Sequence, residues 1–533
     1  MLFTSLSFFI FLAVTLILFY VLPKKCQWIV LLVASFVFYI SFSWKFLFFI
    51  ISTIVTIYGA TFGIEKVNKQ QTEYLENNQG LTLEEKKNIK AKNKKKKKLY
   101  VTLCILFNIG ILFVLKYANF FATNFVGLIN LMGGKISPVA IKLILPLGIS
   151  FYSFQAVGYL LDVYWGKTTA EKNIFRLALF VSFFPQIVQG PISRHSDLAP
   201  QLAEEKKFNY SALMRGIMLI LWGLFKKVLI ADAIAGIVNV GFDKVAELNG
   251  LQTWVTILAY LIQDYMDFSG CIDIAVGVAE CFGIKLAHNF NRPYFALTIE
   301  EYWRRWHITL GSWFKDYIFY PISISKFSLK FGKFCKKHSK PNSYLAKQMP
   351  AIFGLLVVWL TTGLWHGASW NYICWGLYYG ILVIISIVFK PLFIKIQEKL
   401  HINTDSVWYK IFQWVRTIWL LCIGRIIFRA ASLGDAWLMI TKSFTFIFKY
   451  KLTSLSMLTA EPKYLIPAGI AFVIVLAVDI IKEFKKDISI RDTISRWGYT
   501  LQTVVIVFLI VGLVLYGSYG PGYSAQDFIY MQF

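Results

Sequence analysis

Two histidines stand in surroundings that suit acid–base chemistry. His366 ends a membrane-length apolar run that begins at Ala351 and closes in a Gly-Leu-Trp-His-Gly stretch, and His307 follows the charged aromatic run that begins at Glu300. A strongly polar side chain at membrane depth is costly, so its presence there indicates a functional site. We therefore take His366 as the first candidate. The alternative is a histidine whose ring nitrogens are satisfied by neighbouring helices or interfacial water.

Such histidines suit any reaction in which a proton is taken from a hydroxyl, and acyl transfer from a thioester to a hydroxyl is one of them. This reaction needs a base for the hydroxyl proton and a donor group that stabilises the tetrahedral oxyanion. Imidazole acts as a base near neutral pH, so we assign that role to His366. His307 is assigned to positioning or to oxyanion stabilisation. A metal site of these two histidines would lack a third ligand at helical spacing, and the seven cysteines never form C-x-x-C. We therefore predict no metal site.

The composition is that of a polytopic helical membrane protein. Of the 533 residues, 57% are hydrophobic and 16% are charged. Backbone polar groups in a bilayer must be satisfied internally, which favours helices, so we predict an all-α fold with about 10–12 transmembrane helices. Re-entrant or interfacial helices are expected where glycine and proline interrupt apolar runs. The net charge of +26 falls largely in loops, where lysines set orientation and meet anionic lipid headgroups. We predict no nucleic-acid partner.

Charge also predicts the topology of the chain. Residues 65–98 hold eleven lysines and five glutamates, a composition that cannot bury a core. We predict that this stretch is a cytoplasmic mobile loop or exposed helix, dispensable for chemistry. The amino terminus then lies outside the cell, and the basic stretch 482–496 puts the carboxyl terminus there as well. The chain is expected to form one membrane domain over residues 1–533 of the plasma membrane, ending in a helix and tail at 498–533.

One apolar segment contains a proline and a glycine that interrupt it, and a second contains acidic residues. Residues 141–164 contain Pro146 and Gly148, which predict a kink or half-helix. Asp264 and Asp267 share one helix face at i and i+3 within a second segment. We expect them to pair with cations in a buried network that positions helices, in preference to catalysis. The candidate partners are the nearest arginines in the sequence, Arg292, Arg304 and Arg305. Gly376 and Gly380 form a G-x-x-x-G pair that allows close helix approach.

Five stretches resemble the membrane-bound O-acyltransferase (MBOAT) family, in particular the bacterial, AlgI-like branch that contains the alginate O-acetyltransferase membrane subunit. They read LPLGISFYSFQ, GPISR, DFSGCIDIA, WRRWHITL and WHGASWN, and they begin at Leu145, Gly190, Asp267, Trp303 and Trp365. They occur in the order of the family and cover the chain. The resemblance implies the MBOAT fold and an O-acyltransferase. It also implies that His366 is the catalytic histidine and His307 the second characteristic one.

The resemblance further implies a donor, an acceptor and a partner. An acyl group, acetyl from acetyl-CoA in this branch, is expected to pass from a cytoplasmic thioester across the bilayer to an extracytoplasmic polysaccharide, without a bound cofactor. A related, DltB-like branch uses a carrier-protein thioester for D-alanyl transfer to teichoic acid, and the sequence does not separate the two. A transporter of lipid-linked saccharide, with Asp and His as proton relays, is the alternative from another class. It has no evident need for the two paired histidine motifs.

Four residues are expected to bind substrate: Arg194, Asn371, Trp306 and Trp365. The guanidinium of Arg194 can pair bidentately with donor phosphates, although positive loops are also the norm on the cytoplasmic side.

The last six residues, FIYMQF, resemble the carboxyl-terminal F-I-Y-x-x-F motif of the AlgI-like branch. Because the tail is expected outside while the thioester is inside, we predict that Tyr530 is a nucleophile activated by His366. The resulting acyl-tyrosine would be unloaded onto the glycan by an extracytoplasmic SGNH-type esterase. The alternatives are a tail that anchors at the interface or only docks this partner.

Overall fold

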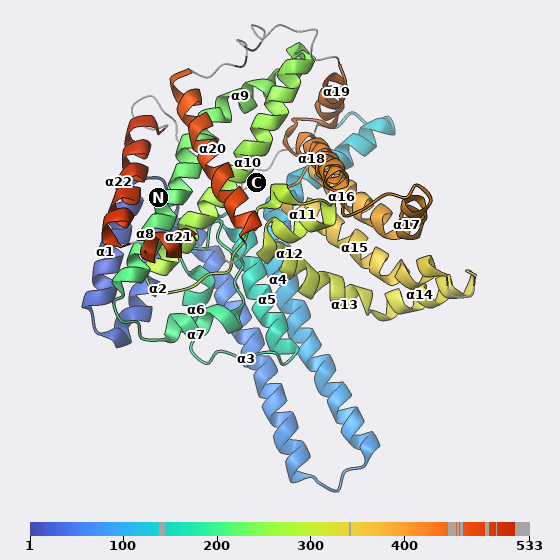
Figure 1. Ribbon diagram of the computed structural model, residues 1–533. Coiled ribbons are helices and arrows are strands. Elements are labelled where there is room, and N and C mark those ends of the chain that lie inside the picture. The colour runs from blue at the N-terminus through green and yellow to red at the C-terminus, as the bar shows by residue number, and fades with distance from the viewer. Residues whose placement is uncertain are drawn as a thin grey trace. The chain divides into compact units, whose positions relative to one another are not determined.

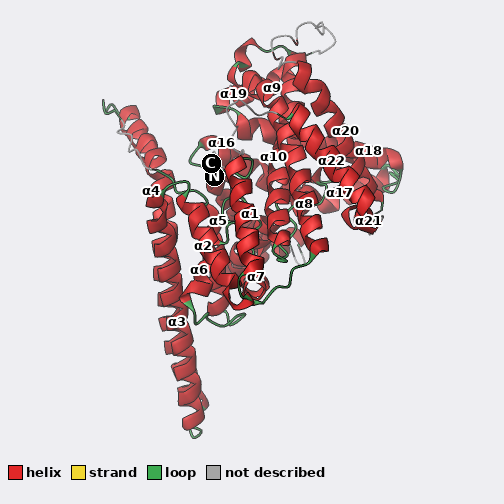
Figure 2. Cartoon of the chain, turned by 90° about the vertical axis from the view of Figure 1, so that its left-hand side faces the viewer, coloured by secondary structure: helices red, strands yellow, loops and turns green. Residues whose placement is uncertain are grey.

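The computed structural model describes residues 1–137, 144–340, 343–445, 455, 458, 462–485, 490–496 and 498–517. Figure 2 shows that these residues form helices joined by loops, with no strand among them. The predicted all-α class is therefore confirmed. The motif around Tyr530 lies outside the described residues.

Seven of the described helices are long and apolar enough to cross a membrane, and the helix Leu6–Val21 is a shorter apolar one. The seven are Trp44–Asn77, Leu83–Leu131, Tyr344–His366, Trp370–Val388, Val407–Arg429, Tyr464–Phe484 and Tyr499–Tyr516. This count for the described part of the chain is below the predicted number of spans. Several predicted spans are instead shorter helices or are broken, and helix α10 (Gly250–Cys281) carries four acidic residues.

The chain divides into two compact units. Unit 1 comprises Met1–Gly216 and Ala275–Ala287, and unit 2 comprises Ile217–Ile274 and His288–Phe533. The helices of unit 1 are α1 (Leu6–Val21), α2 (Gln27–Ile40), α3 (Leu47–Asn77), α4 (Leu83–Leu131), α5 (Ile149–Tyr164), α6 (Ile174–Ser182) and α7 (His195–Ala203), with part of α8 (Tyr210–Leu224) and the end of α10.

The rest of the described chain belongs to unit 2. Its helices are α9 (Asp232–Asp243), most of α10, α11 (Ile299–Arg305), α12 (Ile308–Phe314), α13 (Tyr320–Ser323), α14 (Lys326–Lys337), α15 (Tyr344–His366), α16 (Trp370–Val388), α17 (Lys390–Lys399), α18 (Val407–Arg429), α19 (Leu433–Ser443), α20 (Pro462–Phe484), α21 (Ile490–Arg496) and α22 (Tyr499–Tyr516).

Helices α3 and α4 form a long hairpin that extends beyond α5, α6 and α7 of the same unit (Figure 1). Lys97 Nζ lies 2.8 Å from Asn68 Oδ1 across the hairpin. At the turn, Thr82 and Glu85 form a capping box, which satisfies free backbone donors at the start of α4. The lysine-rich stretch 65–98 therefore comprises the exposed end of α3, a turn and the exposed start of α4, so it is mainly helical, one of the two predicted forms.

The break predicted at Pro146 and Gly148 is confirmed. Helix α5 begins only at Ile149, because Gly148 adopts a left-handed backbone with φ of 70°. A side chain at Gly148 would also collide with the carbonyl of Ile187. Glycine therefore sets the start of this helix.

Helices α15 and α16 of unit 2 pack closely against each other through glycines. A Cβ atom at Gly380 would lie 2.9 Å from Cβ of Trp359, and one at Gly376 would collide with the Trp359 carbonyl. The close approach predicted for this glycine pair is confirmed.

A buried ionic cluster joins α10 to the π-helical segment Phe225–Ala231, which follows α8. Lys227 Nζ lies 2.5 Å from an oxygen of Asp267 and 2.9 Å from one of Asp232. Lys226 Nζ lies 2.6 Å from Asp273. The charge of a buried lysine is compensated by neighbouring carboxylates, so these ion pairs hold the helices together. This is the positioning network predicted for the acidic residues of α10.

The predicted partners of these carboxylates were wrong. Arg292 and Arg305 pair with Glu483 at 2.7 and 3.0 Å, and Arg304 pairs with Glu300 at 3.1 Å. The arginines nearest in the sequence are thus used elsewhere. Folding instead brings Asp264 and Asp267 to cations of helices that are remote in the sequence or precede them.

Candidate active site

His307 and His366 lie against the same buried ring in unit 2. The centroid of the Trp365 ring is 6.1 Å from that of His307 and 4.8 Å from that of His366. Both imidazoles are buried, with 3% and 4% of their surface exposed. The structure therefore brings together the two histidines and the tryptophan that the sequence singled out.

His307 is held by an unusual backbone conformation between α11 and α12. Its φ is 46°, in the left-handed region, which is unfavourable for a residue with a side chain. Two backbone hydrogen bonds fix this turn to the preceding segment. Ile308 N donates to Asn289 O at 2.9 Å, and Asn291 N donates to Arg305 O at 2.9 Å. The segment 289–291 therefore fixes the backbone of this turn and so orients the imidazole.

The side chain of Asn289 determines which nitrogen of His307 carries the proton. Its Oδ1 accepts hydrogen bonds from Thr309 N at 3.1 Å and Thr309 Oγ1 at 2.9 Å, and it lies 3.1 Å from His307 Nδ1. A backbone N–H only donates, so the atom it meets is the amide oxygen, which only accepts. Nδ1 of His307 must therefore carry the proton, and the Nε2 atom of the neutral ring has a lone pair.

Burial keeps this imidazole neutral. It lowers the pKa of His307 from 6.5 to about 3, because the charged form is poorly solvated there. A neutral ring protonated on Nδ1 offers an acceptor, and no donor, at Nε2. The geometry therefore suits a positioning role better than oxyanion stabilisation, the two roles considered from the sequence.

His366 is the last residue of α15 and is surrounded by aromatic rings. The ring centroids of Trp375 and Phe428 are 4.8 and 5.1 Å from its own, and both rings present an edge or face at right angles to the imidazole. Tyr372 lies farther away, at 6.4 Å. These contacts leave the imidazole little rotational freedom and shield it from water.

The other predicted binding residues of unit 2 are also buried. Trp306 stacks on Tyr302 with centroids 5.6 Å apart. Asn371 donates from Nδ2 to Ala430 O at 2.7 Å, which ties the start of α16 to the end of α18. Arg194 belongs to unit 1, where it occupies the position before α7 and is half-buried. The substrate contacts of these residues remain predictions.

Sequence reasoning missed a second polar group of unit 2, centred on Arg425 of α18. This buried guanidinium lies 2.6 Å from Asp264 Oδ2, donates to Tyr302 Oη at 2.8 Å and sits 4.4 Å from the Trp306 ring centroid. An arginine inside a membrane-length run is itself a functional signal, so the sequence held this clue. Asn289 gave no such clue, because its partners are decided by the fold.

No group of three or more His, Cys, Asp or Glu side chains among the described residues could hold a metal ion. The two imidazoles, their aromatic surroundings and a fixed tautomer are the groups that the site offers for acid–base chemistry.

Comparison with known proteins gives the family of the chain. Residues 170–335 match MBOAT, the membrane-bound O-acyltransferase family. The chain is 30% identical over 481 residues to the probable alginate O-acetylase AlgI of Azotobacter vinelandii, an alignment that covers 88% of this chain and 84% of that protein. It is 35% identical over 366 residues to the peptidoglycan O-acetyltransferase of Helicobacter pylori, covering 64% of this chain and 63% of that protein.

A further relative is named for the transfer of a different acyl group. The chain is 30% identical over 284 residues to the teichoic acid D-alanyltransferase of Bacillus subtilis, covering 53% of this chain and 68% of that protein. The matched family region contains Asn289 and His307, and the extended alignments reach well beyond it. The chain belongs to the membrane-bound O-acyltransferase family and is an O-acyltransferase.

Proposed function

We propose that this enzyme moves an acetyl group from a cytoplasmic thioester to a polysaccharide outside the cell. The single observation that carries the proposal is the placement of two buried histidines, His307 and His366, against the ring of Trp365. The names of the relatives from Azotobacter vinelandii and Helicobacter pylori support acetyl as the group and a cell-envelope glycan as the acceptor class.

His366 acts as the general base. It removes the proton of the attacking hydroxyl while the oxygen bonds to the carbonyl carbon of the thioester. The tetrahedral intermediate then collapses, the C–S bond breaks, and the thiolate leaves with the proton from His366. His307 accepts a hydrogen bond at Nε2 from a substrate donor group and so positions the substrate. The aromatic rings around His366 exclude water that would hydrolyse the thioester.

The donor is acetyl-CoA, which reacts and leaves without remaining as a bound cofactor. Its phosphates are assigned to Arg194 because a guanidinium matches phosphate oxygens. The enzyme sits in the plasma membrane with both termini outside, and the α3–α4 hairpin lies in the cytoplasm. This orientation rests on the eleven lysines of residues 65–98.

The first acceptor of the acetyl group is Tyr530. The distance between a cytoplasmic donor and an external glycan requires an intermediate carrier, and the FIYMQF tail supplies a phenol. An SGNH-type esterase outside the cell then transfers the acetyl group from the tyrosine ester to a glycan hydroxyl. The phenol regains its proton in that second step.

D-Alanyl transfer is the second candidate function, favoured by the identity to the Bacillus subtilis protein. Mass spectrometry of cell-surface glycans from a deletion strain tests both. Loss of acetyl esters, restored by the intact gene, supports the first proposal. Loss of D-alanyl esters with unchanged acetylation would replace it with the second.

A further inference from the structure

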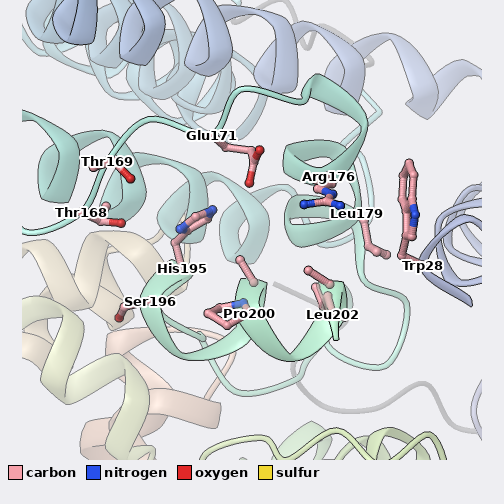
Figure 3. A pocket seen from close by; sticks show the side chains of 12 residues that line it. Trp28, Thr168, Thr169, Glu171, Arg176, Leu179, His195, Ser196, Pro200 and Leu202 are labelled. Atoms are coloured by element: carbon pink, nitrogen blue, oxygen red, sulfur yellow. The ribbon is translucent and has the colours of Figure 1, made fainter. Parts of the chain in front are cut away.

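Unit 1 contains a cavity of about 420 Å³ that the proposed reaction does not use. It lies between α6, α7 and the loop that joins α5 to α6, as Figure 3 shows. One part of its wall is apolar and consists of Leu179, Ala199, Pro200, Leu202 and Ala203. The cavity is large enough for a small organic ligand and combines this apolar wall with charged side chains.

Three polar side chains from different elements converge on this space. In Figure 3 the side chains of Glu171 in the loop, Arg176 in α6 and His195 in α7 surround the same cavity. The guanidinium of Arg176 lies 5.9 Å from the ring centroid of Trp28, which closes one flank. Neither Glu171 nor Arg176 forms an ion pair with any residue that the structure describes. The Glu171 carboxylate accepts one backbone hydrogen bond, from Asn173 N at 3.0 Å, and it faces the same cavity as the Arg176 guanidinium.

His195 adds a neutral polar atom. Its ring is held against Tyr159 at 4.3 Å and Phe180 at 4.9 Å, and burial lowers its pKa despite the nearby carboxylates of Glu171 and Asp162. The Nε2 atom is buried and has no hydrogen-bond partner within the described chain. A buried ring nitrogen of this kind is stabilised by a ligand that hydrogen-bonds to it.

The cavity lies at a lysine-bearing end of unit 1. Trp28 stands at the start of α2, just after Lys24 and Lys25, and Gln27 donates to the carbonyl of Lys206 in the loop after α7 at 2.9 Å. Tryptophan and lysine beside apolar helices mark the level of lipid headgroups. Phe175, next to Arg176, is 60% exposed and offers apolar surface of the kind that lipid chains cover.

We propose that this cavity binds the headgroup of an ethanolamine phospholipid. Arg176 pairs with the phosphate, Glu171 pairs with the primary ammonium, and Nε2 of His195 hydrogen-bonds to the headgroup. A purely anionic headgroup fits less well, because the carboxylate of Glu171 would face its phosphate without an ammonium to compensate. None of the residues assigned to acyl transfer lines this cavity.

The test is native mass spectrometry of the full chain in detergent with equal amounts of phosphatidylethanolamine and phosphatidylglycerol. Wild-type protein should retain phosphatidylethanolamine about tenfold better, the ratio that one charge-assisted hydrogen bond readily gives. Glu171→Gln should abolish that preference, whereas Arg176→Gln should weaken retention of both lipids. Lys172→Gln is the matched control, since Lys172 is exposed and does not line the cavity, and it should behave as wild type.

A second measurement covers variants that fold poorly. Phosphatidylethanolamine should raise the melting temperature of wild type and of Lys172→Gln more than phosphatidylglycerol does, whereas the two lipids should act alike on Glu171→Gln, because stabilisation follows affinity. Free phosphoethanolamine serves as a further arm. If it gives the same shift without lipid, the headgroup chemistry is supported and the source is a soluble ester. Equal retention of both lipids by wild type and Glu171→Gln would overturn the proposal.

Discussion

The amide oxygen of Asn289 lies 3.1 Å from Nδ1 of His307 while it accepts both donors of Thr309. This oxygen cannot donate, so it fixes the imidazole with its proton on Nδ1 and its lone pair on Nε2. Asn289 is therefore a positioning residue that acts through His307.

Asn289→Leu should lower kcat by about 10- to 100-fold, as the loss of an orienting outer partner commonly does. Asn289→Asp tests the tautomer itself. A carboxylate stabilises the imidazolium and raises the pKa of His307 from about 3, so activity should acquire a new decline toward low pH. The measurement is the pH dependence of acyl transfer in proteoliposomes, with Thr309→Val as the control that leaves the His307 contact in place. An unchanged profile in Asn289→Asp would contradict the assignment.

The neutral state of His307 also predicts how stability depends on pH. The folded pKa of about 3 lies below the ordinary value of 6.5, so the unfolded chain binds a proton first as pH falls. This stabilising contribution is present above pH 6.5 and is lost between 6.5 and 3. The melting temperature in detergent should therefore fall more from pH 7.5 to about 5 in wild type than in His307→Gln. Parallel curves for the two proteins would show that the pKa of His307 is not lowered by folding.

His366→Ala should reduce acyl transfer by about 10²- to 10⁴-fold while the protein remains folded and in the membrane. The reason is the loss of the base that takes the hydroxyl proton. Glycan acetylation measured by mass spectrometry gives the readout, and His338→Ala is the control because His338 is exposed on unit 2. Near wild-type acetylation in His366→Ala would sink the assignment.

Tyr530→Phe should abolish glycan acetylation, since it keeps the aromatic ring but removes the oxygen that would carry the acetyl group. Intact-protein mass spectrometry should show an added acetyl group on the wild-type tail and none on this variant. Tyr523→Phe, in the same tail, is the matched control and should retain activity. Full activity of Tyr530→Phe would rule out the tyrosine ester and leave a tail that anchors or docks.

A cysteine introduced at Asn77, the exposed last residue of α3, reports the orientation of the hairpin. An impermeant thiol reagent added to intact cells should not label it beyond the parent chain, whereas permeabilised cells should show labelling. The lysine bias of residues 65–98 is the physical reason. Labelling of intact cells would show that the topology is inverted.

Local patterns in the sequence predicted features that depend on local physics. The left-handed Gly148 and the close approach at Gly376 and Gly380 follow from what glycine permits, so the pattern sufficed. The histidine motifs likewise pointed to His307 and His366. Their common neighbour, the ring of Trp365, follows only from the folded chain.

Partners between remote helices could not be predicted in the same way. Asp264 pairs with Arg425, and Asp267 pairs with Lys227, although several arginines stand closer in the sequence. Which cation a buried carboxylate meets is decided by helix packing, and the sequence carries no direct measure of that distance. The pattern of apolar residues likewise does not predict the π-helical turn that contains Lys226 and Lys227.

The hairpin of unit 1 has a mechanical consequence. Helix α4 runs without a break from Leu83 to Leu131, so its basic outer part and its apolar part form one rod roughly 70 Å long. Inside the apolar part, Asn108 of α4 hydrogen-bonds Thr56 of α3 at 3.1 Å, which couples the two rods to each other. Long α-helices bend only gently. A force applied at the charged tip is therefore transmitted along the stiff helix to the apolar helices of unit 1. A flexible linker in its place would not transmit it.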